Sequence, residues 1–204
     1  MTLRDYLRAQ AYNNAFCNLR LLNAVARLSP EDFAASRTSF FPSIRATLNH
    51  NLTVDWYYVD ALERCVAGQP VNAAGRDFFE PEEPCATIEH LAAEQRGVDR
   101  RLVALTEALT EADLDRPVAV QRRVGVLFEP LPRLLGHLFQ HQIHHRGQAH
   151  AMLAGTPVAP PQLDEFFCAN EERLRATELA ELGYTEAQIW GDSAAPGGVE
   201  ATRS

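Results

Sequence analysis

The chain has 204 residues, of which 46% are hydrophobic and 23% are charged, so we predict one compact globular domain with a sizeable core. Its formal net charge of −8 argues against a nucleic-acid or anionic-membrane surface, because either would need a basic patch. All 19 basic residues are arginine, so mechanisms that use a lysine nucleophile or a lysine Schiff base are excluded.

The cellular compartment can be predicted from three features of the sequence: its cysteines, its first residues and its apolar runs. Cys17, Cys65, Cys85 and Cys168 are scattered without a CxxC pair, so neither a disulfide framework nor a thiolate zinc site is expected. The first ten residues lack the apolar region of a signal peptide, and no apolar run approaches the ~20 residues of a transmembrane helix. We therefore expect a cytoplasmic protein with reduced thiols and no membrane partner.

Apolar residues at three- and four-residue intervals predict a first long helix over residues 2–28. Ser29 and Pro30 then begin a short helix. A second long helix is predicted over residues 42–66. One of its faces is uncharged and carries His50, and Asp55 falls within its apolar arc.

The second half of the chain begins with a loop over residues 68–86, which is rich in glycine, proline and acidic residues. Third and fourth long helices are predicted over 87–109 and 130–154, and alternating valines between them indicate a small β-excursion over 117–128. The remainder is predicted as a helix over 163–181, a capped turn from Thr185 and a frayed tail from Pro196.

Four long helices with long connections are typical of a four-helix bundle, so the predicted fold class is all-α with short peripheral helices. We assign residues 1–168 to the bundle domain. Residues 169–204 are expected to form a C-terminal helical extension and tail, which lies on or beside the same domain.

Five of the seven histidines lie within residues 137–150, HLFQHQIHHRGQAH. His141 and His145 are four residues apart, so on a helix they lie about 40° apart and can bind one cation together. They also continue the apolar stripe of the preceding leucines. Burying two imidazoles at such positions is costly without a partner, and a divalent metal ion would satisfy both.

Other interpretations of the same segment remain open. His141 and His144, three residues apart, could also chelate, although His144 lies about 100° away from His145. His137 lies at the edge of the stripe as a support for the ligands or a pocket wall, and His150 is expected at the surface. The histidines could also be hydrogen-bonded core residues. Position 142 is glutamine, so the general base of HExxH metalloproteases is absent.

A metal site needs a third ligand, for which His50 and His90 are the remaining histidines. Periodicity favours His50, because His90 follows Glu89 at the start of a helix, where exposure is the default. Asp55 is a candidate acceptor for a ligand imidazole N–H. The alternative, which we favour, is that it finds its partners within the packed core.

Residues 47–50 (TLNH), 137–148 (HLFQHQIHHRGQ) and 160–164 (PPQLD) resemble the DinB-like (damage-inducible) family. The resemblance extends over about residues 3–168. It implies a four-helix bundle of up-down-down-up topology, which is often a homodimer. It also implies one divalent transition metal ion bound by His50, His141 and His145.

Three neutral imidazoles leave a metal ion charged and with open coordination positions, so it can activate water or a small thiol. Related branches of the family include thiol-dependent S-transferases. We therefore expect a metal-dependent thiol transferase or hydrolase whose partner is a small-molecule thiol or electrophile. The alternative is a non-catalytic metal-binding or stress-related interaction module. Asp55, His137 and His144 are the candidate general bases, and imidazole ligands do not distinguish zinc, nickel and iron.

Overall fold

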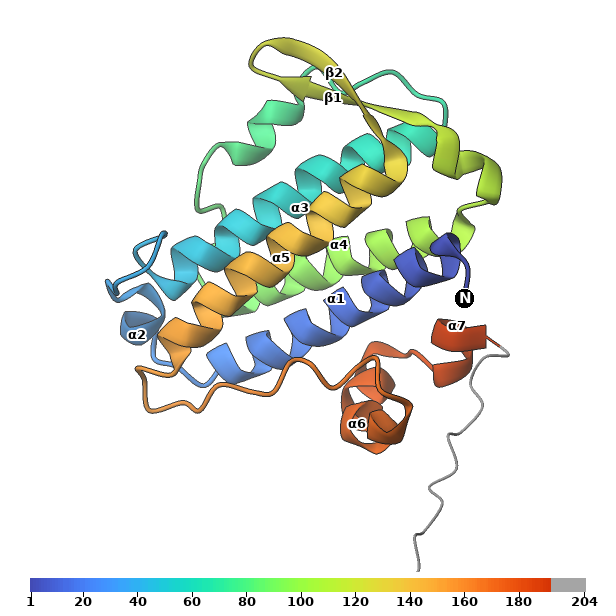
Figure 1. Cartoon of the computed structure of the whole chain (residues 1–204). Helices are drawn as coiled ribbons and strands as arrows, with labels where there is room; N and C mark the ends of the chain where they lie inside the picture. Colours follow the sequence, from blue (N-terminus) through green and yellow to red (C-terminus); the bar gives the residue numbers. More distant parts are fainter. Residues whose placement is uncertain (192–204) are drawn as a thin grey trace, which may run out of the picture.

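The structure, a computed structural model, describes residues 1–191 and is mostly helical (Figure 1). The four expected long helices are present, each within a few residues of its predicted ends. They are α1 (Leu3–Val25), α3 (Ile44–Val66), α4 (Ile88–Ala108) and α5 (Leu131–Leu153). The shorter helical elements are α2 (Pro30–Ala34), η1 (Gly75–Phe79), η2 (Glu111–Asp115), η3 (Ala169–Glu171), α6 (Glu172–Leu182) and α7 (Glu186–Trp190).

The starts of α1, α3 and α4 follow from their capping residues. The Thr2 hydroxyl accepts a hydrogen bond from the Asp5 amide, and the Asp5 carboxylate accepts one from the Thr2 amide, so α1 begins with a capping box. The side chains of Ser43 and Thr87 cap α3 and α4 in the simpler way. These hydroxyls satisfy backbone amides that the first turn of a helix leaves unpaired.

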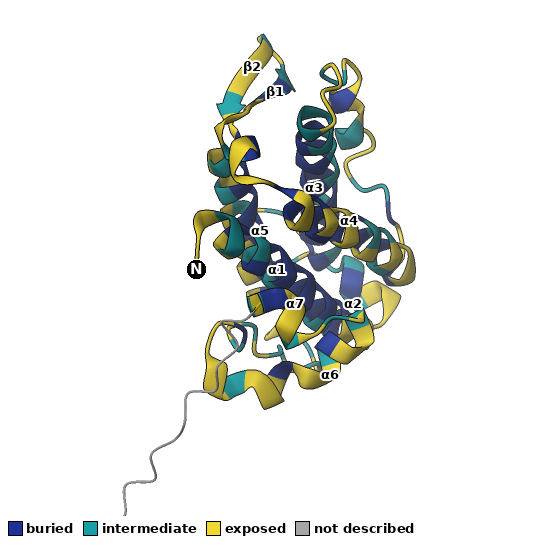
Figure 2. Ribbon diagram, turned by 90° about the vertical axis from the view of Figure 1, so that its right-hand side faces the viewer, coloured by how far each residue is buried: buried dark blue, intermediate teal, exposed yellow. Residues whose placement is uncertain are grey.

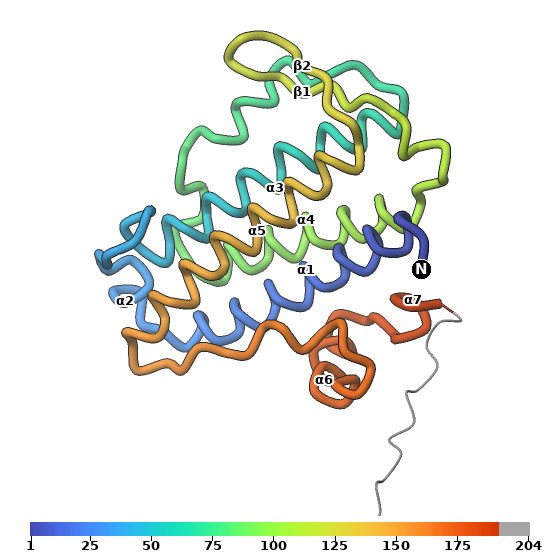
Figure 3. Tube along the Cα trace, viewed as in Figure 1, coloured from blue at the N-terminus to red at the C-terminus, as the bar shows by residue number. Residues whose placement is uncertain are grey.

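The four long helices lie side by side around a common core. α1 contacts α4 and α5, and α3 contacts the same two helices. Figures 1 and 3 show that α1 and α5 run in one direction and α3 and α4 in the other, because the connection between α3 and α4 returns along the length of the helices. Figure 2 shows the buried residues on the faces that the helices turn toward one another.

A layer of polar side chains crosses this core. Asn14 and Asn18 of α1 donate from their amides to the Asp99 carboxylate on α4, and their carbonyl oxygens accept from Nη1 of Arg146 on α5. Gln95 of α4 donates to Asp99 and also to Asp55 of α3. All four long helices therefore contribute to one buried hydrogen-bonded network.

The β-excursion is confirmed as an antiparallel hairpin of β1 (Pro117–Arg122) and β2 (Gly125–Pro130), with Val118 opposite Glu129. Val118 and Val120 are buried, whereas the apolar residues of β2 are exposed. β1 contacts α3, so the hairpin lies beside the end of the helices, and the all-α class needs the addition of this small sheet.

The predicted helix over 163–181 is wrong in its first half, because α6 begins only at Glu172. Tertiary contacts hold the preceding residues in a non-helical conformation. The Leu163 carbonyl accepts from the Cys17 thiol, and Phe166 is buried against Phe16, with ring centroids 5.6 Å apart. The capped turn at Thr185 is confirmed as the start of α7, and the tail from Pro196 lies outside the described residues.

Within residues 1–191, the helices are too short or too polar to cross a bilayer.

Candidate metal centre

Three histidines converge where α3 faces α5. His50 comes from α3, and His141 and His145 come from successive turns of α5. One ligand nitrogen from each ring lies within 4.8 Å of the other two. The Nε2 atoms of His50 and His141 are 3.0 Å apart. Two ligands on one tetrahedral ion with bonds of 2.0–2.1 Å are about 3.3 Å apart, so the cluster has the dimensions of a metal site.

The surroundings of the three rings favour the neutral form. Burial lowers the pKa of His50 to about 4 and that of His141 to about 3, and repulsion from neighbouring imidazoles adds to the effect. Burial also lowers the pKa of His145, which is the most enclosed of the three. Each ring is therefore neutral at pH 7 and keeps one nitrogen lone pair for a cation.

Gln148 determines which nitrogen of His145 is free. Its side-chain oxygen Oε1 lies 2.8 Å from Nδ1 of His145, and its Nε2 lies 3.1 Å from Nε2 of His144. An amide oxygen only accepts, so Nδ1 of His145 carries the proton and Nε2 keeps the lone pair. Such a hydrogen bond behind a ligand orients the ring and makes it more basic. Gln148 follows His145 by three residues and so lies on the same face of the helix, and this spacing is the one sequence signal for the role.

Two phenylalanines in the segment between α2 and α3 cover one side of the cluster. The ring of Phe41 is 4.4 Å from that of His50 and 5.4 Å from that of His145. Phe40 is 6.3 Å from His145 and is 78% exposed. Nothing in the local sequence pattern identified this contact, because it depends on how the segment folds back over α5.

His141 lacks the hydrogen bond that usually supports a histidine ligand of a metal ion. Its Nδ1 is buried and has no hydrogen-bond partner among residues 1–191. Histidine ligands usually donate this N–H to an acceptor, so His141 relies on helix packing for its orientation. The donor set otherwise fits a divalent transition ion, with three neutral imidazoles and, within the described chain, no fourth histidine, cysteine or carboxylate in the group.

The other three candidate histidines are not members of the group of converging ligand nitrogens. His137 is exposed, with its ring 5.4 Å from Tyr58 and 6.3 Å from His141. His144 is also exposed and borders His145 at 4.7 Å. His90 is exposed beside Glu94, 3.8 Å away, and is not part of the cluster.

Asp55 and His150 are the two other residues whose positions were predicted. Asp55 is fully buried and accepts from Gln95 at 2.7 Å, and within residues 1–191 it has no hydrogen bond to a histidine. It is therefore a core acid with a packing partner, which is the reading the sequence favoured. The predicted surface position of His150 needs correction. This residue is half-buried, and its Nε2 lies 2.8 Å from the Pro161 carbonyl oxygen.

A comparison of the sequence with models of known protein families shows to which family the chain belongs. The sequence model of the DinB family matches residues 8–178, a span that contains the whole histidine cluster. The chain belongs to the DinB family. The resemblance found in the sequence motifs is thereby confirmed. Comparison with the curated proteins finds no match.

Proposed function

We propose that His50, His141 and His145 bind one divalent transition metal ion and that this DinB protein is a metal-dependent thiol transferase or hydrolase. The observation that carries the proposal is the convergence of three neutral imidazoles from two helices. Zinc, nickel and iron all suit such ligands, and an ion held by them acts as a Lewis acid toward water or a thiol. The substrate is accordingly a small-molecule thiol or an electrophile.

The residues around the cluster have separate roles in this proposal. Gln148 holds the tautomer of His145, and Phe41 limits the access of water on one side. His144 and His137 are exposed beside the cluster and are available to carry a proton to or from a substrate. Asp55 is unsuitable as the base, because burial raises its pKa to about 8 and keeps the carboxyl protonated at neutral pH.

Two cavities flank the cluster along α5 and offer room for a substrate. One has a volume of about 410 Å³ and is lined by Gln148 and Arg37, among others. The other, of about 240 Å³, lies beside His137 and includes Arg122 and Arg133. Glu129 shares the smaller cavity with its two arginines, and Arg37 pairs with Asp32 at 3.7 Å, so the charges of the linings do not define the substrate further.

A non-catalytic metal-binding or interaction module is the alternative function. Structural metal sites are usually closed by four protein ligands, whereas open sites leave a position for water or substrate. The cluster has three candidate ligands within the described chain, which supports the catalytic reading.

We also propose a cytoplasmic homodimer for the protein. The up-down-down-up four-helix bundle of the resemblance belongs to the same proposal, and the directions of α1, α3, α4 and α5 support it. The described helices cannot cross a membrane, and this agrees with the cytoplasm. Light scattering on the purified chain tests the dimer, and a mass of one chain would contradict it.

The ligand assignment is tested by metal analysis of single variants. His50→Ala, His141→Ala and His145→Ala should each lower the bound metal well below one ion per chain, because two imidazoles bind much more weakly than three. His90→Ala is the matched control and should keep wild-type metal content, since this exposed histidine lies outside the cluster. Full occupancy in His50→Ala, or loss in His90→Ala, would show that the third ligand is assigned wrongly.

Catalysis is tested by comparing metal-loaded and metal-free protein with a panel of low-molecular-weight thiols, electrophiles and esters. Turnover should require the metal and should disappear in His141→Ala while the helical circular dichroism is retained. Stoichiometric metal binding without turnover of any substrate class would favour the non-catalytic module.

A further inference from the structure

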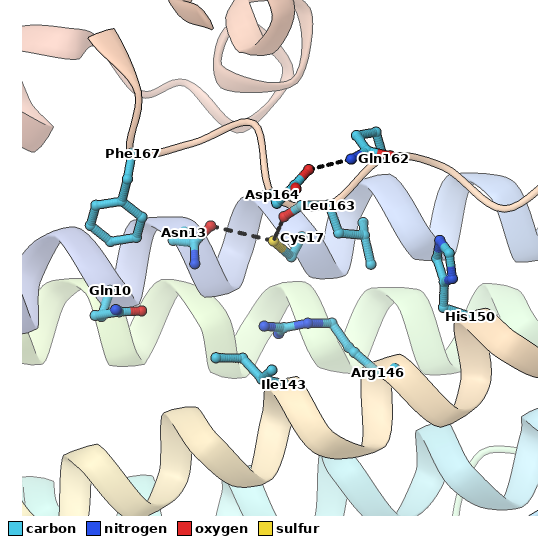
Figure 4. Close-up of a pocket in the computed structure, with 11 residues that line it drawn as sticks. Gln10, Asn13, Cys17, Ile143, Arg146, His150, Gln162, Leu163, Asp164 and Phe167 are labelled. Atoms are coloured by element: carbon cyan, nitrogen blue, oxygen red, sulfur yellow. Dashed lines mark hydrogen bonds between the residues drawn. The ribbon is translucent and has the colours of Figure 1, made fainter.

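A separate cavity lies on the opposite side of α5 from the histidine cluster. It has a volume of about 520 Å³, within the usual range for small-molecule sites, and lies between α1, α5 and the segment that follows α5 (Figure 4). His150 and Gly147 line it on α5, and they are turned away from the face that carries His141 and His145. The metal proposal therefore does not use this cavity.

Arg146 supplies the charge of the cavity. Its side chain is only 4% exposed, and Figure 4 shows it reaching from α5 toward Cys17 and Asn13 of α1. Within residues 1–191, its hydrogen bonds are made through Nη1 alone, to Asn14 and Asn18, and it has no salt bridge. The Nε and Nη2 donors are thus left for a ligand.

The negative charge of Asp99 compensates the positive charge of Arg146 only indirectly. The amides of Asn14 and Asn18 bridge the guanidinium to the Asp99 carboxylate, so Asp99 is one residue removed from Arg146. A buried cation without a directly paired anion is costly. A carboxylate bound to the free side of the guanidinium would form the missing pair with two charge-assisted hydrogen bonds.

Three apolar side chains of the lining are suited to an apolar body. Ile143, Leu163 and Phe167 line the cavity, and Ile143 and Phe167 are 46% and 40% exposed. The second charged residue of the lining is Asp164, which is exposed and accepts a hydrogen bond from Gln162. Its exposure screens the repulsion between Asp164 and a bound anion.

We propose that this cavity binds a small organic carboxylate. Its charged end pairs with Arg146 and its apolar body lies against Ile143, Leu163 and Phe167. The site is independent of the metal centre, although both lie on α5.

Calorimetric titration of the full chain with 3-phenylpropionate and with its neutral amide, 3-phenylpropanamide, tests the charge requirement. The acid should bind at least about tenfold more tightly than the amide, because only the carboxylate pairs with the guanidinium. Equal affinities, or no binding of the acid, would overturn the proposal.

Gly147→Leu tests the location of the site without removing a polar contact. A Cβ atom added at this position meets no other atom within 4 Å, so the leucine side chain can extend into the cavity. The variant protein should therefore fold normally. Gly136→Leu is the matched control, since this glycine lies on the same helix with equal free space but does not line the cavity. Gly147→Leu should weaken binding of 3-phenylpropionate at least about tenfold, and Gly136→Leu should not.

Arg146→Gln completes the series with a change in charge. Acid and amide should then bind with similar affinity. Because Arg146 also joins the core network, this variant is informative only alongside the folded Gly147→Leu protein. Wild-type affinity in Gly147→Leu would place the ligand elsewhere and overturn the proposal.

Discussion

Gln148 lies between two histidines that differ in their surroundings. Its oxygen accepts from Nδ1 of buried His145 and its amide nitrogen donates to exposed His144. This one side chain determines which nitrogen of His145 keeps its lone pair. His141 lacks an equivalent partner at Nδ1, so the cluster depends on Gln148 more than a fully supported site would.

Removing that support should weaken metal binding. We expect Gln148→Leu to reduce zinc affinity about 10–100-fold, because His145 loses both its fixed tautomer and its orientation. Gln148→Glu keeps an acceptor oxygen and should stay near wild type. Competition titration with a zinc indicator measures the effect, with exposed Gln140→Leu on the same helix as control. Unchanged affinity in Gln148→Leu would mean that packing alone orients the ring.

At the scale of the elements, Asn49 ties the long connection after α3 back onto the helix. Its side chain donates to the Cys85 carbonyl at 2.9 Å and accepts from the Cys85 amide at 2.8 Å, and both residues are fully buried. The connection is thereby held alongside the long helices, which allows α4 to start at the same end as α3. A polar side chain in the interior of α3 thus takes part in the topology.

Asn49→Ala leaves two buried backbone groups of Cys85 unpaired. We expect a loss of about 1–3 kcal/mol in the free energy of unfolding, measured by urea denaturation. The control is Asn23→Ala, whose exposed side chain has only a 3.3 Å contact with Glu181, and it should change stability by less than about 0.5 kcal/mol. Equal stability of the two variants would show that the connection is held by its apolar contacts instead.

At the scale of the whole molecule, the polar layer joins all four long helices and contains two acids. Burial and repulsion from Asp99 raise the pKa of Asp55 to about 8, and burial raises that of Asp99 to about 6. In the unfolded chain both carboxyls have ordinary, lower pKa values. At pH values between the unfolded-state and folded-state pKa of each carboxyl, the folded protein binds more protons than the unfolded chain. The free energy of unfolding therefore falls as the pH rises through this range.

The consequence is measurable between pH 6.5 and 8, where Asp55 titrates in the folded state alone. The free energy of unfolding should fall by about 0.5–1 kcal/mol across this window, because the loss at Asp55 exceeds the opposite contribution of the cluster histidines, whose pKa values folding lowers. Asp55→Asn should abolish this fall, because it removes the titrating group while keeping an acceptor for Gln95. Exposed Glu82→Gln should keep the wild-type slope. A flat wild-type profile would contradict the raised pKa of Asp55.

Local pattern was sufficient for the long helices and for two of the three candidate ligands. Periodicity and capping residues depend on neighbours within a few positions, so the bounds of α1, α3, α4 and α5 could be predicted closely. The pairing of His141 with His145 is equally local, since both lie on one helix face. The segment before α6 could not be predicted, because contacts with α1 override its helical propensity.

The tertiary structure decided everything that depends on which helices face each other. His50 meets the α5 histidines only because α3 lies beside α5 with the appropriate axial offset, and one-dimensional periodicity carries no information on that offset. The packing of segments far apart in the chain also produces the contact of Phe41 with the cluster, the core network and the cavity lined by Arg146. The sequence by itself determined the elements and the chemistry of their faces, because these are properties of short segments. The convergence of those faces follows from packing, because it joins residues far apart in the chain.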